Sequence, residues 1–351
     1  MHMADALLTP AVAATMYVAS GATTGVCINK LSKDDNTVKL PTMAVTAALV
    51  FAGQMVNYTI PGTGSSGHLC GGMLLSALLG PFAGFLSMVV ILAIQCLFFA
   101  DGGLLALGAN CWNMAFYGCF VGYYLIWKPI VKSGLFGGKE SKAANRIKII
   151  AASVIGCVVT LQLGAFSVVV QTSLSGVTEL PFGTFVTVMQ PIHLAIGLIE
   201  GLITGAVLTF VAESRPELLQ AVDSTKMKDR LSLKTTIIVM AVAVIVVGGG
   251  VSLLASSNPD GLEWSMFGNE DAGYSANMAL DEEAYGVTSE AADVAASVQE
   301  KTAFLPDYAF ADSDSIAGTS VSGIVGSAMV AVLAVAICFI GGFFRKKKQK
   351  V

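Results

Sequence analysis

Charged residues are scarce in this chain. Asp, Glu, Lys and Arg make up 13% of its 351 residues, and only three histidines are present, at positions 2, 68 and 193. Ordinary soluble domains carry about 25% charged residues, so the composition excludes that class. The seven cysteines lie mostly within apolar stretches and include no CxxC pair. This pattern favours buried apolar thiols over a disulfide framework or a zinc site.

Two sequence signals are also absent. The segment 137–140, Gly-Gly-Lys-Glu, lacks the hydroxyl residue and the leading glycine of a phosphate-binding loop, so ATP-driven work requires a partner chain. No basic segment precedes an apolar run at the start, and Asp5 follows closely. We therefore expect no cleaved signal peptide, and we expect Met1 to be the mature N-terminus. We expect no organic cofactor and no nucleic-acid partner.

Apolar runs dominate the chain instead. Hydrophobic residues make up 54% of it, and several runs reach the roughly 20 residues that an α-helix needs to cross a bilayer. They predict an all-α integral membrane protein with spans at residues 9–28, 41–58, 69–80, 82–100, 103–127, 147–171, 188–212, 235–255 and 322–344. The third run is short for a full crossing, and Gly80-Pro81 separates it from the next helix.

The distribution of charge requires the short run to cross. With the N-terminus outside, the basic segments all lie inside and hold 19 of the 20 Lys and Arg residues; they are 29–40, 128–148, 213–234 and 345–351. Omitting the short span would place some of these basic segments on each side of the membrane, against the positive-inside rule. We therefore predict a multi-pass protein of the cell membrane, with its N-terminus outside and its C-terminus in the cytoplasm.

The spans divide the chain into two units. Residues 1–212 form a predicted bundle of seven spans, and residues 213–234 form a charged cytoplasmic linker. Residues 235–351 contain two transmembrane helices that bracket an outer loop, 256–321, with 13 Asp and Glu residues. The loop is rich in small and acidic residues, which is typical of a segment that is only partly ordered.

The first two residues, Met1 and His2, form a candidate chelator. A free α-amino group, the amide nitrogen of residue 2 and the imidazole of His2 can close two chelate rings on one divalent cation. A planar set of nitrogen donors favours Ni²⁺, Cu²⁺ or Co²⁺ over Mg²⁺ or Ca²⁺. The alternative is a chance Met-His start on a frayed tail.

A turn histidine offers a fourth nitrogen. His68 follows a loop, 60–67, that contains a proline and three glycines, so that another backbone can approach closely. If the N-terminal tail folds back into the bundle, His68 can join Met1 and His2. A partner must then hold its other ring nitrogen, and Gln54, Asn57 and Ser66 are candidates. The alternative is a turn histidine that caps a helix.

Polar side chains interrupt several apolar runs. Such groups are costly when unpaired in a membrane, so they should face the bundle or a cavity; they are Gln54, Asn57, Gln95, Asn110, Asn113 and Glu200. Glu200 follows His193 by seven residues, on the same face of one helix. We consider Asn110, His193 and Glu200 as candidates that either hold a metal-binding side chain in place or line a path through the bundle. We slightly favour a structural role for Glu200, and a proton-coupled secondary metal carrier that uses His193 and Glu200 remains an alternative.

A third function is compatible with one short pattern. Residues 64–67 match GxSG, the pattern around the serine of rhomboid-type intramembrane proteases, and His193 could act as the base for Ser66. Four mostly small residues are weak evidence in a chain with 37 glycines. This alternative also leaves His2 and the acidic loop without a role.

Several motifs, in constant order, resemble the CbiM/NikM family, the substrate-binding membrane subunits of energy-coupling-factor cobalt and nickel importers. They are MHMADALL at 1–8, AGQMVN at 52–57, GH at 67–68, LGP at 79–81, DGGLLALGAN at 101–110 and IHLAIGLIEG at 192–201. A later stretch, NPDGLEW at 258–264, resembles the PDGLE domain, related to the small CbiN/NikN subunit. The chain therefore resembles a fusion of two transporter subunits.

The resemblance implies a function and a ligand set. The cargo would be Co²⁺ or Ni²⁺, held by the terminal amine of Met1, the backbone nitrogen and imidazole of His2, and the imidazole of His68. The resemblance also implies a transmembrane coupling (T) subunit and a pair of cytoplasmic ATP-binding subunits, so this chain would be a non-catalytic part of the importer. The auxiliary segment is expected to help load the metal. Cobalt and nickel stay undistinguished, because both ions carry the same charge and accept the same donors.

Overall fold

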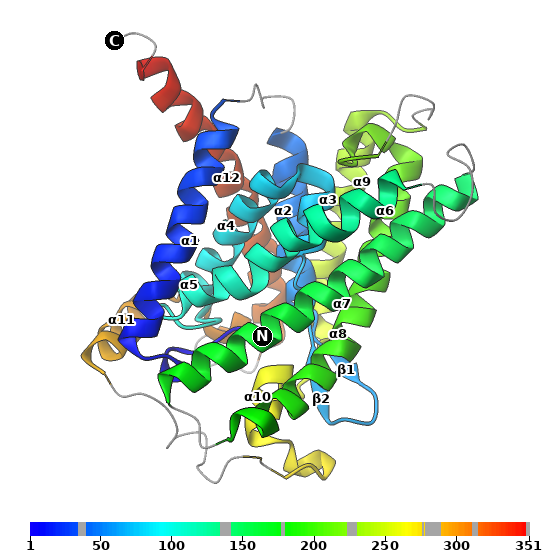
Figure 1. Cartoon of the computed structure of the whole chain (residues 1–351). Helices are drawn as coiled ribbons and strands as arrows, with labels where there is room; N and C mark the ends of the chain where they lie inside the picture. The colour runs from blue at the N-terminus through cyan, green and yellow to red at the C-terminus, as the bar shows by residue number, and fades with distance from the viewer. Residues whose placement is uncertain are drawn as a thin grey trace.

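The computed structural model describes residues 1–33, 40–133, 142–176, 180–222, 230–275, 277, 289–310 and 315–348. Parts of the predicted basic segments (34–39, 134–141, 223–229 and 349–351) and of the predicted outer loop (276, 278–288 and 311–314) lie outside the described residues. What is described is a bundle of long helices with one short β-hairpin at one end (Figure 1).

Every predicted span coincides with a helix, so the all-α membrane fold is confirmed. In chain order the helices are α1 (Pro10–Leu31), α2 (Leu40–Gln54), α3 (Gly72–Leu79), α4 (Pro81–Phe99), α5 (Leu107–Asn110) continued by η3 (Cys111–Trp127) and α6 (Lys128–Lys132), α7 (Lys142–Ser175), α8 (Phe182–Ser214), α9 (Leu233–Gly249) and α12 (Ala317–Lys348). Within the described residues, seven helical segments are long and apolar enough to cross a membrane, and α2 and α3 are shorter. Six cysteines among the described residues are free and buried, as predicted.

The short third span combines non-helical chain and helix. The strands β1 (Tyr58–Ile60) and β2 (Ser65–Gly67) pair in antiparallel fashion, and residues 68–71 then lead into α3. At eight residues, α3 is about 12 Å long, which is too short to cross a bilayer alone. All of α3 is buried, and Ala77 O near its far end accepts a hydrogen bond from Gln220 N. The segment 68–80 therefore runs through the middle of the bundle, where its non-helical part borders a cavity instead of lipid.

The second unit packs against the first. Helices α9 and α12 contact α2, and α7 pairs with α8 along most of their lengths (Figure 1). The described residues of the predicted outer loop form η5 (Val251–Leu254), α10 (Gly261–Phe267), η6 (Glu270–Ala272), α11 (Glu290–Thr302) and η7 (Pro306–Tyr308). A capping box starts α10, because the Asp260 side chain accepts from the Glu263 backbone and Glu263 accepts from the Asp260 backbone. The described part of this loop thus contains short helices, and the expectation of partial order stays a prediction.

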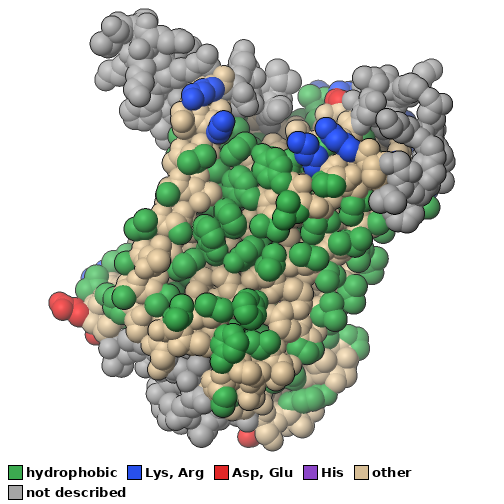
Figure 2. Space-filling view, viewed as in Figure 1, with side chains coloured by type: hydrophobic (Ala, Val, Ile, Leu, Met, Phe, Trp, Pro, Cys, Tyr) green, Lys and Arg blue, Asp and Glu red, His purple; other side chains and the backbone are tan. Residues whose placement is uncertain are grey.

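The surface separates apolar and charged residues. Figure 2 shows hydrophobic side chains over the middle of the molecule, Lys and Arg side chains at one end, and Asp and Glu side chains mainly toward the other end. The β-hairpin and α10 lie at the end opposite these basic residues (Figure 1). This arrangement is typical of a membrane protein with a basic cytoplasmic face.

Candidate metal site

The N-terminal tail lies inside the bundle, as the chelator hypothesis requires. Met3 N donates to Asn110 Oδ1 at 2.8 Å, and Asn110 Nδ2 donates back to Met3 O at 3.1 Å. Gly103 N also donates to Met3 O, at 2.9 Å. A Cβ at Gly103 would overlap Asp5, so only glycine lets this loop close over the tail. Of the predicted candidates, Asn110 is the one that clamps the tail.

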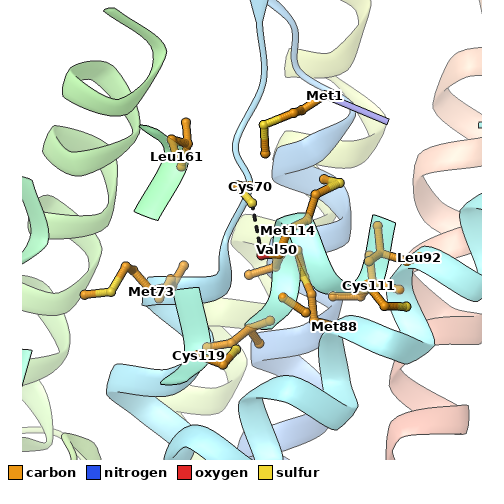
Figure 3. Packing of buried hydrophobic residues seen from close by; sticks show 14 of the residues in the cluster. Met1, Val50, Cys70, Met73, Met88, Leu92, Cys111, Met114, Cys119 and Leu161 are labelled. Carbon is orange, nitrogen blue, oxygen red and sulfur yellow. Dashed lines mark hydrogen bonds between the residues drawn. The ribbon is translucent and has the colours of Figure 1, made fainter. Parts of the chain in front are cut away.

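Met1 anchors the terminus. The residue is 6% exposed, and its thioether belongs to the apolar core that includes Met114 and Leu161 (Figure 3). Its amine nitrogen is 3.5 Å from His68 Nε2 and 2.5 Å from Asp260 Oδ2. The amine is therefore held in a buried position beside one imidazole and one carboxylate.

His2 lies beside His68. The two rings stack, with centroids 5.2 Å apart and planes inclined by 17°. His2 Nδ1 is 3.1 Å from Asp101 Oδ1, and His2 Nε2 is 3.3 Å from Gln95 Oε1. Gln95 Nε2 donates to Gln54 Oε1 at 3.0 Å, which connects the predicted candidate Gln54 to the site through Gln95. The burial of His2 lowers the pKa of its imidazole, against the charge of Asp101.

His68 presents one ring nitrogen to the amine. Its Nδ1 lies 3.0 Å from Leu69 O, and an Nδ1–H donated there leaves the lone pair of Nε2 facing Met1. A backbone carbonyl thus takes the role that we predicted for Gln54, Asn57 or Ser66. Burial, and then the positive charge of the amine, lower the pKa of His68 to about 3. The imidazole is therefore neutral at physiological pH, the protonation state that binding a metal would require.

Asp260 brings the second unit into the site. Its Oδ2 contacts the amine of Met1, and its Oδ1 accepts from Leu262 N and Glu263 N at the start of α10. Burial would raise the pKa of this carboxyl, but the ammonium charge and its hydrogen bond hold the pKa below its usual value. Asp260 and Asp101 were absent from the predicted site, although both lie in motifs that we had quoted, PDGLE and DGG.

Glu200 supports the non-helical segment that carries His68. It is 1% exposed, and its two carboxylate oxygens accept Cys70 N at 2.8 Å and Gly71 N at 2.9 Å. These N–H groups precede α3 and would otherwise have no helical acceptor. The geometry thus matches the structural role favoured for Glu200.

The other candidates lie around the hairpin. Asn57 O accepts Ser256 N at 2.8 Å, so Asn57 holds the second unit by its backbone. Ser66 Oγ donates to Asn258 O at 2.8 Å. His193 Nδ1 lies 2.8 Å from Met189 O, one helical turn away. These partners provide no nucleophile–base hydrogen bond between Ser66 and His193, the arrangement that the protease alternative needs.

The donors at this site are mostly main-chain and imidazole nitrogens. Among the described residues, no group of three His, Cys, Asp or Glu side chains could hold a metal ion. A cation site here would therefore need a donor other than these side chains, and the terminal amine lies 3.5 Å from His68 Nε2. Nitrogen donors of this kind suit late first-row divalent ions.

Comparisons with known proteins match both units. The family model for the cobalt uptake substrate-specific transmembrane region matches residues 2–218, and the model for the PDGLE domain matches residues 234–341. A protein of Archaeoglobus fulgidus named "putative fused nickel transport protein NikMN" is 34% identical over 96% of this chain and 98% of its own length. The "cobalt transport protein CbiM" of Sorangium cellulosum is 31% identical over 51% of this chain and 76% of its own length. The crystal structure of a truncated transition metal transporter aligns with a TM-score of 0.52 at 30% identity, covering 61% of this chain and 99% of that one.

Proposed function

The chain belongs to the CbiM family of cobalt uptake substrate-specific transmembrane regions and is a membrane component of cobalt or nickel transport, and we propose that it captures Co²⁺ or Ni²⁺ through four nitrogen donors. The proposed donors are the amine of Met1, the amide and imidazole nitrogens of His2 and the imidazole of His68. One observation carries this proposal: the buried amine lies 3.5 Å from His68 Nε2, next to a His2 ring that stacks on His68. No other region of the described chain gathers both imidazoles and a main-chain amine.

The chemistry of capture follows from these contacts. The cation replaces the proton of the ammonium group and the N–H of the His2 amide, and His2 Nδ1 turns from Asp101 to the cation. Asp101 and Asp260 stay beside the site, where their negative charges favour a bound divalent ion over the empty site. A rigid nitrogen set favours ions that accept planar coordination, and nickel and cobalt both satisfy that condition.

The proposal extends to topology and partners. The basic end of the molecule (Figure 2) would face the cytoplasm, which puts the site and the N-terminus outside. Residues 1–212 would form the metal-binding unit, 213–234 the linker and 235–351 the auxiliary unit. The sequence has no phosphate-binding loop, so a coupling (T) subunit and cytoplasmic ATP-binding subunits would drive uptake.

Metal binding should release about two protons per cation near pH 6. The pKa of His68 is lowered to about 3, so its imidazole is neutral and releases none, and burial lowers the pKa of His2, so its imidazole releases less than a free one would. The ammonium group and the amide then supply most of the protons, and Kd should rise about 100-fold for each unit by which the pH falls. Calorimetry in buffers with different protonation enthalpies measures the number. A release of nearly four protons would mean that both histidines titrate normally.

The proton-coupled carrier makes a different prediction for Glu200. We expect Glu200→Gln to lower the free energy of unfolding by about 1–3 kcal/mol, because one buried N–H loses its carboxylate acceptor. Uptake should still require the ATP-binding partners and should survive a protonophore. Glu217→Gln, at an exposed ion pair, is the matched control. Uptake without an ATPase, abolished by Glu200→Gln, would instead establish the carrier.

The protease alternative is tested at Ser66. Because the Ser66 hydroxyl donates to Asn258 O and no base contacts it, a serine-reactive probe should leave Ser66 unlabelled. Mass spectrometry of the treated protein checks this. Labelling that disappears in Ser66→Ala would reopen the enzymatic function.

A further inference from the structure

His193 has a ring nitrogen that the capture chemistry does not use. The residue is 1% exposed on α8, and its Nδ1 faces Met189 O at 2.8 Å. An Nδ1–H donated to this carbonyl leaves Nε2 with a lone pair, and Nε2 is buried without a hydrogen-bond partner among the described residues. Metal-binding histidines are held in the same way, with one ring nitrogen fixed by a carbonyl and the other left free.

The imidazole of His193 lines the pocket of the proposed metal site. Met1, His68 and Asp260 line the same pocket. A Cβ placed on Gly261, at the start of α10, would lie 3.0 Å from His193 Cε1. The Cε1 edge of the ring therefore faces the start of α10, and Asp260, the residue before α10, lines the same pocket. Asp260 is 22% exposed, so this side of the pocket reaches solvent.

The register of α8 places His193 on the outer side of His68. Glu200 binds the backbone of Cys70 and Gly71, and Gly67 packs directly against Ile196. His68 is thus level with Ile196. His193 is three residues nearer to the start of α8, about 4.5 Å along the helix axis. That end of α8 lies near the β-hairpin and α10, away from the basic end (Figure 1).

We propose that His193 Nε2 and the carboxylate of Asp260 form a loading position, which holds the cargo cation before the amine and the two other imidazoles take it up. This inference rests on the proposed function. An imidazole nitrogen and a carboxylate oxygen together suit Co²⁺ and Ni²⁺. Asp260 Oδ2 already lies 2.5 Å from the amine, so a cation bound there is next to its first permanent ligand. As the amine binds the cation, its displaced proton leaves to water.

The loading position predicts a kinetic effect without a change in affinity. His193→Phe retains a ring of similar size and removes the nitrogen ligand. Purified full-length chain with an authentic Met1 is mixed rapidly with CoCl₂, and the absorption bands of nitrogen-bound cobalt are followed; release is followed after addition of a chelator. We expect His193→Phe to slow loading and release by the same factor, about tenfold or more, as for loss of a metal-site partner. Kd then stays within about twofold, because Kd is the ratio of the release rate to the loading rate and both rates fall by the same factor.

Two further variants keep the experiment decisive. Met189→Leu changes a buried side chain one turn away and preserves the carbonyl that binds His193, so it controls for disturbed packing of α8. His193→Gln keeps an oxygen ligand and should load at an intermediate rate, which supports the proposal even if the phenylalanine variant misfolds.

The possible results separate the two proposals. Loading of His193→Phe and His193→Gln at the wild-type rate would overturn the loading position, and would suit a pocket in which His193 only binds water. A large loss of affinity with altered cobalt bands would also overturn it, since His193 would then be a permanent ligand. If the unmodified chain binds no cobalt at all, the proposed function itself fails.

Discussion

Adding residues ahead of Met1 is expected to abolish tight Co²⁺ and Ni²⁺ binding. The extension turns the amine into an amide, and it removes the ammonium group that neutralises Asp260 at 2.5 Å. It also has little room, because Met1 is 6% exposed. If a metal-binding free energy of about 12 kcal/mol is shared by four donors, losing one costs about 3 kcal/mol, or a factor of about 100 in Kd. Calorimetric titration of the purified chain measures this loss.

The control for this experiment is the same protein with its terminus restored. An extension that ends in a protease site can be cut to leave Met1 as the first residue, and cutting should recover full affinity. Helical content should be the same before and after cutting, because Met3 and the following residues keep their contacts with Asn110 and Gly103. Tight binding by the uncut protein would contradict a site that is built on the terminal amine.

Replacing either of the two stacked histidines should have a comparable effect. We expect His68→Ala to lose the nitrogen that faces the amine at 3.5 Å, and His2→Ala to lose the side-chain chelate ring. Tight Ni²⁺ binding should be lost in both, with Kd raised about 100-fold as for the extension, while the metal-free proteins melt within a few degrees of the parent. The measurement is thermal unfolding with and without excess NiCl₂, since a ligand that binds only the folded state raises Tm.

A matched variant separates the nitrogen ligands from general packing. His193→Phe removes a third buried imidazole of the same pocket but leaves the proposed nitrogen set complete, so Ni²⁺ should still raise its Tm. Retention of tight binding in both His2→Ala and His68→Ala would refute the site. Loss of the metal-free fold in those variants would show up as an early melting transition, and His68→Gln would then replace the alanine change.

Local patterns were sufficient for the helices and for some of the proposed ligands. Runs of apolar residues predict the spans because a membrane helix buries its backbone groups within itself, so its position depends on nearby sequence alone. Met1 and His2 could be paired because a chelate ring joins neighbouring residues. His68 needed one further condition, the folding back of the tail, and the structure meets it through Asn110.

Sequence patterns failed where contacts join distant residues. Asp260 is separated from Met1 by 259 positions in the sequence, and Asp101 and His2, which are also far apart in the sequence, lie 3.1 Å apart. The shape of the short span was also missed: hydropathy indicates a crossing, but it does not show that residues 68–71 are non-helical and that Glu200 binds the backbone of Cys70 and Gly71. Such contacts depend on how helices rotate and slide against each other, which no single segment specifies.

For this protein, the amino-acid sequence by itself determined the class of fold, the distribution of charge along the chain and the nitrogen-rich beginning, because each depends on residues that are adjacent or regularly spaced. The tertiary structure alone decided that a carboxylate of the second unit meets the terminal amine and that a third imidazole shares the pocket. These groups come from α8, α10 and the N-terminal tail, and they meet only because packing of the whole bundle sets the distances between them.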